Sequence, residues 1–256
     1  MIGLTNAPVG AATPGRLQFD KKTSHGRPQF DDTANLPPNR AVEGGRPYEK
    51  PHTQYFNENP AVLTHERTLK LNIFGMEFRF LTNNGLFSCD KIDAASILLL
   101  EQLPALTGRL LDLGCGYGTL GIVLARKNTV VLTMSDINRI ALDYAAKNAV
   151  LNQVEAEIIH SDGFENLGDK EKRFGKYDNI VLNPPIHAGK EVMYRLYTGA
   201  AAHLTPSGAL YIVIHKKHGA ESTMRALNEI FSECRVLYKK KGLYVLQYIS
   251  AALSEK

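Results

Sequence analysis

The sequence has few cysteines and no long apolar run, and both absences narrow the classes of protein that it can encode. Its three cysteines, Cys89, Cys115 and Cys234, are too few and too scattered for a zinc site or a disulfide framework. The longest apolar candidate, residues 209–214, has the length of a strand, whereas a membrane helix needs about 20 apolar residues. The N-terminus also lacks the charged-then-apolar pattern of a secretory signal. We therefore expect a reducing, cytoplasmic location, with no membrane segment and no bound metal.

The chain also lacks a strong excess of charge of one sign. Residues 1–50 carry 7 Lys and Arg against 5 Asp and Glu, which leaves 23 against 21 in the rest of the chain, for a formal net charge of +4. Proteins that bind nucleic acid through their overall field carry a clear basic excess. Any contact with RNA is therefore expected to depend on a local patch of basic residues.

The first 52 residues differ in composition from the remainder. They contain 7 of the 12 prolines and show no sustained hydrophobic periodicity. We expect residues 1–52 to form a disordered tail rich in proline and glycine, and residues 53–256 to form one domain.

Strands and helices are expected to alternate along that domain. Residues 68–73 and 76–81 predict a hairpin, and residues 94–103 predict a buried helix. Alternation of this kind predicts an α/β fold with a mostly parallel, doubly wound sheet that is covered by helices on both faces. The further expected strands are 130–134, 156–160, 177–182, 209–214, 236–240 and 243–249, the helices 138–151, 190–204 and 222–231, and a turn is expected at 205–208.

The stretch LLDLGCGYGTLG, from Leu110 to Gly121, predicts a buried strand, a tight turn and a helix. Gly114, Gly116 and Gly118 occupy alternate positions in the turn, where glycine permits positive φ and lets the backbone approach a ligand. This pattern predicts a site for an adenosine-containing cofactor. It does not choose the cofactor, because Gly116, Gly118 and Gly121 also match the G-x-G-x-x-G spacing of nicotinamide-binding proteins.

Acidic residues near the ends of three expected strands bear on that choice. Asp112 precedes the glycine turn, where a carboxylate repels a pyrophosphate but attracts a cation such as S-adenosylmethionine, by roughly 4 kcal/mol at about 4 Å and an effective dielectric near 20. Asp136 is placed to accept the ribose hydroxyls of either cofactor. Asp162 is placed to accept the adenine amine, with Phe164 against the ring. Each acid also has a plainer interpretation as a cap or turn residue.

The tetrapeptide Asn183-Pro184-Pro185-Ile186 follows a strand and bears on the reaction class. The side-chain oxygen of Asn183 and the carbonyl of Pro184 would form a pair of acceptors on a loop that two prolines stiffen. A planar amine of guanine, adenine or a glutamine amide has two hydrogens to donate to them. Such an arrangement aims the nitrogen lone pair at an incoming methyl group and stabilises the transition state most. The plainer interpretation is a turn after a strand.

Together, the motifs DLGCGYG, Asp136 and NPPI, preceded by GLFSCDKIDAAS, resemble those of the class I S-adenosylmethionine-dependent methyltransferases. Within that family the chain is most similar to the small-domain group that includes the ribosomal RNA guanine amino-group methyltransferases. The resemblance covers about residues 55–249 and implies a Rossmann-like, seven-stranded sheet with an antiparallel last strand. It also implies that Phe87 and Ser88 cap the methionine end of the cofactor. Many members stack an aromatic residue on the base where this chain has Ile186, so stacking is expected to be weaker or to come from elsewhere, with Phe87 as a candidate.

The resulting hypothesis is an N-methyltransferase that acts on a base amine in ribosomal RNA, free or in a ribosomal particle, with guanine favoured. A DNA adenine, a protein glutamine amide, a silent cofactor-binding module and a dehydrogenase stay open as alternatives. Asn183, Pro184, Pro185 and Ile186 are the expected catalytic residues. Substrate is expected to contact His187, Lys190 and Lys216. The residues expected to bind S-adenosylmethionine are Phe87, Ser88, Asp112, Gly114, Cys115, Gly116, Gly118, Asp136, Ile137, Asp162, Gly163 and Asn183.

Overall fold

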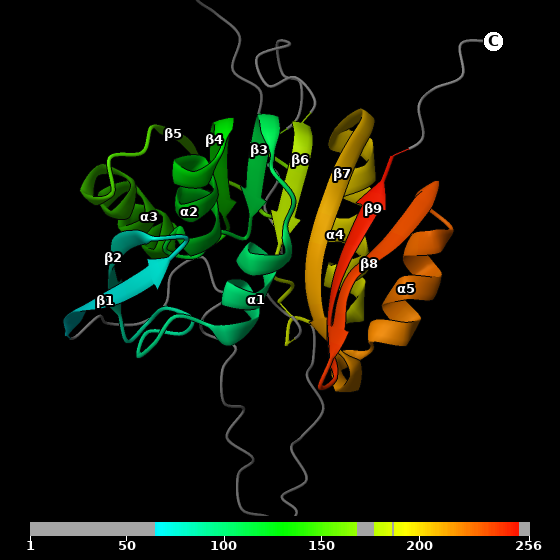
Figure 1. Cartoon of the computed structure of the whole chain (residues 1–256), viewed down its shortest axis with the longest axis horizontal. Helices are drawn as coiled ribbons and strands as arrows, with labels where there is room; N and C mark the ends of the chain where they lie inside the picture. The colour runs from blue at the N-terminus through cyan, green and yellow to red at the C-terminus, as the bar shows by residue number, and fades with distance from the viewer. Residues whose placement is uncertain (1–64, 168–176, 186, 251–256) are drawn as a thin grey trace, which may run out of the picture. The chain divides into compact units, whose positions relative to one another are not determined.

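The computed structural model describes residues 65–167, 177–185 and 187–250, which form a two-stranded sheet and a seven-stranded sheet with helices packed around the larger one (Figure 1). The predicted tail at residues 1–52 and Ile186 lie outside the described residues. Within the described ranges, no helix is long and apolar enough to cross a membrane. The same ranges hold no cluster of three His, Cys, Asp or Glu side chains that could ligate a metal.

The large sheet has the strand order β5-β4-β3-β6-β7-β9-β8 (Figure 1). Strands β5, β4, β3, β6 and β7 pair in parallel, and β9 is antiparallel to both β7 and β8. This confirms the expected mostly parallel sheet with an antiparallel last strand. The strands are β3 (Thr107–Leu113), β4 (Thr129–Asp136), β5 (Ala156–His160), β6 (Tyr177–Leu182), β7 (Leu204–His215), β8 (Glu233–Lys240) and β9 (Leu243–Ile249).

Helices cover both faces of this sheet because successive strand residues point to opposite sides. Leu110 packs in the core under α1, α2 and α3, whereas its neighbour Leu111 packs in the core under α4 and α5. Near-continuous apolar strands such as these are typical of a sheet that is buried on both faces. The helices are α1 (Ala94–Gln102), α2 (Thr119–Lys127), α3 (Arg139–Leu151), α4 (Lys190–His203) and α5 (Ala220–Asn228), and a 3-10 turn, η2 (Lys216–His218), precedes α5.

The predicted hairpin is confirmed as β1 (Glu66–Ile73) and β2 (Met76–Asn83), a separate antiparallel pair. The connecting residues Phe74 and Gly75 both adopt positive φ, at 54° and 74°. This conformation matches the tight turns that join antiparallel strands.

Two asparagines of α3 and its C-terminus anchor the hairpin. The Asn148 amide accepts from the Leu81 N–H at 2.7 Å and donates to the Leu81 carbonyl at 2.9 Å. Asn152, one turn later, makes the same pair of bonds with the Arg79 backbone, at 3.1 and 2.7 Å. Asn148 also donates to the carbonyl of Tyr117, inside the glycine turn, at 2.9 Å. One helix therefore fixes both the hairpin and the glycine turn.

The prediction of a turn at residues 205–208 is wrong, because β7 continues through this segment. Pairing with β6 shifts between two partners: Tyr177 faces Leu204, and Asn179 faces Ala209. Ser207 takes a positive φ of 69° within the irregular stretch. The residues between the two paired positions form a bulge, so turn-type residues are accommodated without ending the strand.

Candidate active site

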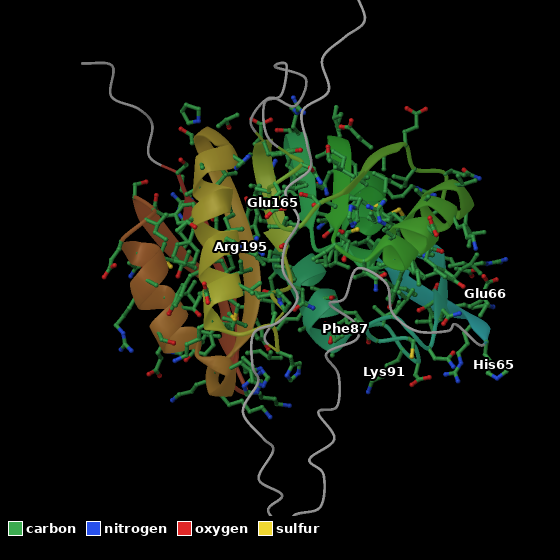
Figure 2. The ribbon with its side chains drawn as sticks, turned by 180° about the vertical axis from the view of Figure 1, so that it is seen from behind. His65, Glu66, Phe87, Lys91, Glu165 and Arg195 are labelled. Carbon is green, nitrogen blue, oxygen red and sulfur yellow. The ribbon has the colours of Figure 1, made fainter. Side chains whose placement is uncertain are left out.

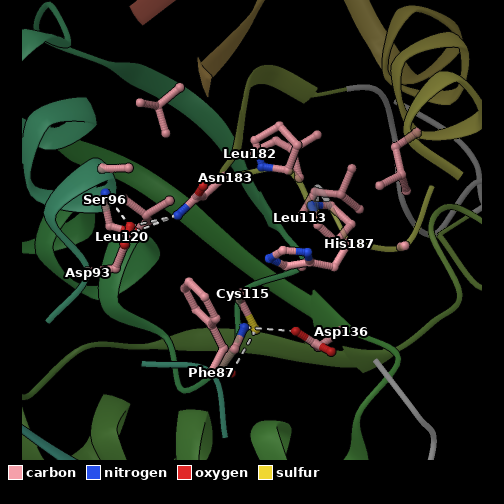
Figure 3. A pocket seen from close by; sticks show the side chains of 18 of the residues that line it. Phe87, Asp93, Ser96, Leu113, Cys115, Leu120, Asp136, Leu182, Asn183 and His187 are labelled. Atoms are coloured by element: carbon pink, nitrogen blue, oxygen red, sulfur yellow. Dashed lines mark hydrogen bonds between the residues drawn. The ribbon is translucent and has the colours of Figure 1, made fainter. Parts of the chain in front are cut away.

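A cavity of about 500 Å³ lies at the carboxyl ends of the central strands (Figure 3). After β3 the chain crosses to β4 on one side, and β6 pairs with β3 on the other side, so the connections diverge and leave a crevice. Residues from several segments that are distant in the sequence meet there. Those expected from the sequence are Phe87, Ser88, Gly114, Cys115, Gly116, Asp136, Ile137, Asp162, Gly163, Asn183, Pro184, Pro185 and His187.

The glycine turn forms one wall of this cavity. Gly114, Gly116 and Gly118 all have positive φ, at 66°, 56° and 92°. A Cβ on Gly116 would meet nothing within 4 Å, so open space lies beside this backbone. Gly118 is different, because a Cβ there would come within 2.9 Å of Ile122 Cδ1, and Gly118 is not part of the cavity lining. Its side faces the protein interior, where the absence of a side chain permits close packing of α2.

Asp136, at the end of β4, lines the cavity and supports the turn. Its Oδ2 accepts from the Gly116 N–H at 2.8 Å, and its Oδ1 accepts from the Asn138 N–H at 2.9 Å. Burial raises the pKa of the Asp136 carboxyl, and these two backbone bonds oppose the increase. A carboxylate has further lone pairs, so Asp136 can still accept from hydroxyl groups in the cavity.

Asp112 lies behind the glycine turn and does not line the cavity. Its side chain is 1% exposed, and its Oδ2 accepts from the Gly121 N–H at 2.7 Å. Burial raises its pKa to about 7, and the bond from Gly121 opposes this increase. The first N–H groups of a helix have no hydrogen-bond partner inside the helix. Asp112 provides the acceptor for one of them in α2, the N–H of Gly121. The expected direct contact between Asp112 and a cationic ligand therefore has no support in this geometry.

The side chain of Asn183 is held from the start of α1. Its Nδ2 donates to Asp93 Oδ2 at 2.9 Å and to Ser96 Oγ at 3.0 Å (Figure 3). A carboxylate without a proton can only accept, so the NH₂ group of the amide faces Asp93 and the oxygen Oδ1 points away from it. Among the residues that the structure describes, Asn183 Oδ1 has no hydrogen-bond partner. The sequence predicted a role for Asn183 but did not identify Asp93 and Ser96 as its hydrogen-bond partners. In the sequence, the spacing of these two residues indicates only a helix cap.

The segment with Phe87 and Ser88 borders the same cavity. Phe87 lines it although its side chain is 51% exposed (Figures 2 and 3). The carbonyl of Ser88 accepts from the hydroxyl of Tyr117 at 3.3 Å. Tyr117 thereby ties this segment to the glycine turn. The ring of Phe87 stays partly in solvent.

Asp162 lines the cavity with a cationic partner already in place. Arg195 Nη2 lies 2.6 Å from Asp162 Oδ1, and Arg195 Nη1 lies 3.5 Å from Glu165 (Figure 2). Phe164 stacks on His203, with ring centroids 4.4 Å apart, and is not part of the lining of this cavity. Phe164 therefore packs beside His203 and outside this cavity lining, and its expected contact with an adenine ring stays a prediction.

The predicted substrate residues are placed unequally. His187 lines the cavity, whereas Lys190, the first residue of α4, and Lys216 do not. Lys216 Nζ lies 3.5 Å from a carboxylate oxygen of Glu221, and both side chains are exposed. Of the three predicted residues, only His187 has direct access to a ligand in the cavity.

Two further histidines line the cavity and were not predicted as ligand contacts. The rings of His215 and His218 lie 5.5 Å apart, and His215 Nδ1 accepts from the Lys217 N–H at 3.2 Å. Partial burial lowers the pKa of His218, and the nearby His215, Lys217 and His187 lower it further. Basic side chains therefore gather at one side of the cavity, although the chain as a whole has little excess charge.

Two sequence relatives are similar to this chain over more than half of its length. The uncharacterized protein YbxB of Bacillus subtilis is 37% identical over 197 residues, which are 75% of this chain and 96% of YbxB. Ribosomal RNA small subunit methyltransferase C of Aeromonas hydrophila is 38% identical over 142 residues, or 54% of this chain. The match covers only 40% of that relative, so the chain spans less than half of it.

A solved structure has the same fold over most of the domain. The 16S rRNA N2 methyltransferase of T. thermophilus, in complex with AdoMet and guanosine, superposes with a TM-score of 0.65 at 30% identity. The match covers 75% of this chain and 52% of that protein. The family profile described as "Methyltransferase small domain" matches residues 77–247, which include the glycine turn, Asn183 and most of β9. The chain therefore belongs to the methyltransferase small-domain family.

Proposed function

We propose that the protein transfers a methyl group from S-adenosylmethionine to the exocyclic amine of a base in ribosomal RNA, with guanine as the first candidate. The observation that carries the proposal is the position of Asn183 in the cavity lining, where its NH₂ group is engaged and its amide oxygen has no hydrogen-bond partner among the residues that the structure describes. The similarity to the 16S rRNA N2 methyltransferase of T. thermophilus, solved with AdoMet and guanosine, supports the choice of cofactor and base.

The cavity suits an adenosine-containing cofactor. Gly116 leaves open space at the backbone, and the carboxylate of Asp136 keeps lone pairs for the ribose hydroxyls. Leu113, Leu120 and Ile137 supply apolar lining, and the volume of about 500 Å³ is within the range of small-molecule sites. Together these residues would hold S-adenosylmethionine, which supplies an activated methyl group on a sulfonium.

The chemistry requires little from the protein except orientation. The lone pair of the amine nitrogen forms the new N–C bond, and the electrons of the S–C bond stay on sulfur, which becomes a neutral thioether. The nitrogen then loses a proton to solvent, because alkylation makes it acidic. Asn183 Oδ1 and the carbonyl of Pro184 accept from the two amine hydrogens, and this interaction strengthens as positive charge develops on nitrogen.

An exposed aromatic ring beside the cavity favours a planar substrate. Phe87 lines the cavity and is 51% exposed. In the sequence, the two prolines are followed by Ile186 and not by an aromatic residue, so Phe87 is the candidate for stacking. A base that stacks on Phe87 gains about 1–3 kcal/mol, by analogy with aromatic platforms in proteins that bind single-stranded nucleic acid. His187 and His218 are available to contact the phosphate groups of an RNA strand.

The decisive experiment supplies labelled S-adenosylmethionine and three classes of acceptor: undermodified ribosomal RNA, DNA, and protein release factors. We expect label on ribosomal RNA, and nuclease digestion to place it on the exocyclic amine of guanine. Label that appears only on DNA or protein would overturn the RNA assignment but keep the methyltransferase. Asn183→Ala, which removes the acceptor oxygen, provides the inactive control for each acceptor.

A further inference from the structure

We propose that Asp93 and Ser96 are positioning residues that hold the Asn183 amide with its oxygen toward the target amine. The inference rests on the proposed methyl transfer and extends it to two side chains that follow the Phe87–Ser88 segment. The structure joins them across separations of 90 and 87 residues in the sequence.

The direction of each hydrogen bond in this group is fixed by chemistry. Asp93 Oδ2 accepts from the Ser96 N–H at 2.8 Å, from Ser96 Oγ at 3.1 Å and from Asn183 Nδ2 at 2.9 Å. Because the Ser96 hydroxyl donates its only hydrogen to Asp93, its lone pairs are left to accept from Asn183. Both amide hydrogens of Asn183 are therefore directed to the α1 side, and the oxygen is directed away from it.

Without these acceptors an asparagine amide has two nearly equivalent orientations, because its terminal torsion is broad and roughly two-fold. Rotation by 180° would set Asn183 Oδ1 against the Asp93 carboxylate and break both bonds. Hydrogen bonds to an ionised acceptor are roughly twice as strong as neutral ones, so one orientation dominates. The acceptor oxygen is thus placed before the substrate binds, which is the arrangement that lowers a transition-state barrier most.

The charge of Asp93 adds to this effect. A carboxylate next to the NH₂ group polarises the amide and increases the electron density on Asn183 Oδ1. The same oxygen would accept from an amine that gains positive charge as the methyl group arrives. Asp93 lines the same cavity as Asn183, and its stabilisation of the transition state acts through the Asn183 amide.

A purely structural role is the competing explanation, because Asp93 is also the N-cap of α1. Asp93→Ser separates the two roles. Serine is an equally good N-cap, but its hydroxyl is shorter than the carboxylate and does not replace the acceptor that faces Asn183. Asp93→Asn keeps one acceptor oxygen at full length, but it removes the charge and replaces the other oxygen with an NH₂ group. Ser96→Ala removes the second acceptor at a position where alanine favours the helix.

The first measurement is kinetic and uses whichever amine substrate the wild type methylates. We expect Asp93→Ser to lower kcat about 10- to 100-fold, Ser96→Ala about 3- to 10-fold and Asp93→Asn less than Asp93→Ser, with the affinity for S-adenosylmethionine changed by less than about threefold. In the Asn183→Ala background, Asp93→Ser should have no further effect. An unchanged kcat in Asp93→Ser, or a full additional loss in the double variant, would overturn the inference.

The second measurement does not depend on activity. The side-chain NH₂ signals of Asn183, assigned through their loss in Asn183→Ala, are followed by NMR for hydrogen exchange in the full chain. We expect exchange to accelerate at least about tenfold in Asp93→Ser, with the thermal midpoint of unfolding little changed. Equal exchange in both proteins would contradict the positioning role. If exchange responds but no acceptor is methylated, the positioning is correct and the proposed function fails.

Discussion

Two walls of the cavity reach their geometry by different means. The glycine turn is held at several independent points: the Cys115 N–H donates to the Ser135 carbonyl and the Gly118 N–H to the Cys115 carbonyl, both at 2.9 Å, and the side chains of Asp136 and Asn148 bond its backbone as well. The acceptor loop after β6 is oriented by side chains, because Asn183 depends on two residues at the start of α1. The first wall is built from neighbouring strands, and the second from elements about 90 residues apart.

This difference indicates which part of the site determines binding and which determines chemistry. A turn fixed by glycine φ angles and by several independent hydrogen bonds presents the same surface whatever the substrate. An amide fixed by a side-chain network can lose its orientation while the fold and the turn persist. Substitutions in the two walls should therefore affect different observables.

The largest expected effect is on turnover, through Asn183→Ala. Loss of one acceptor that acts in the transition state costs about 100- to 1000-fold in kcat. The glycine turn is untouched, so the affinity for S-adenosylmethionine by calorimetry should stay within about threefold. A loss of affinity equal to the loss of turnover would remove the distinction between the two walls.

A matched control, Asn179, lies on β6, the strand that leads to Asn183. Asn179 is buried in β6, and its Nδ2 donates to the Thr107 carbonyl at 2.8 Å, outside the cavity lining. Asn179→Ala should lower the free energy of unfolding by about 1–3 kcal/mol and leave the turnover of the folded enzyme unchanged. If Asn179→Ala also abolishes turnover, the effect of Asn183→Ala cannot be assigned to its oxygen.

The sequence predicted the first wall better than the second for a physical reason. Hydrophobic periods and glycine positions are local signals, and they located β3, β4, β6 and the turn between β3 and α2. Asp112 was expected at the ligand because it is close to the turn in sequence, whereas the structure places its side chain behind the turn and outside the cavity lining. The two-residue period of β3 sets Asp112 on the same face as Leu110, toward α2, and this signal was present in the sequence.

Other features had no local signal. Asp93 and Ser96 were visible only as the start of a helix, and their bond to Asn183 depends on the packing of α1 beside β6. The bulge in β7 was read as a turn because residues 205–208 have turn composition, although pairing resumes at Ala209. The roles assigned to the lining residues stay predictions until a ligand is bound.

A substitution in the glycine turn, Gly118→Ala, should lower the free energy of unfolding while it leaves the turnover of the folded enzyme less affected. In Gly118→Ala, the positive φ of 92° and the close contact with Ile122 at 2.9 Å both oppose a side chain. We expect a loss of about 2–4 kcal/mol in the free energy of unfolding, measured with urea. Gly75→Ala is the control, because it has a similar φ of 74° but meets nothing within 4 Å, and it should cost about 1 kcal/mol. Equal losses would show that packing at Gly118 is unimportant.

The support behind the turn should respond to pH. Burial raises the pKa of Asp112 from 3.8 to about 7, so the folded state holds this proton when the unfolded chain has released it. The stabilisation is present below about pH 4 and is lost as the pH rises to about 7, with a slope of at most about 1.4 kcal/mol per pH unit. Asp112→Asn keeps an acceptor for Gly121 but does not ionise, so its stability relative to the wild type should increase over this window. If the free energies of unfolding of the two proteins change with pH in parallel, the raised pKa of Asp112 is contradicted.

The smallest expected effect concerns Asp162, which lies at the edge of the first wall with Arg195 as its partner. Both side chains are partly exposed, so their ion pair contributes less than about 1 kcal/mol to stability. If Asp162 accepts the adenine amine, Asp162→Ala should weaken the binding of S-adenosylmethionine about three- to tenfold. Arg195→Ala should strengthen it slightly, because the carboxylate is then released from its competitor. Opposite signs in calorimetry would extend the cofactor site to the loop after β5, whereas changes of the same sign would restrict it to the turn and Asp136.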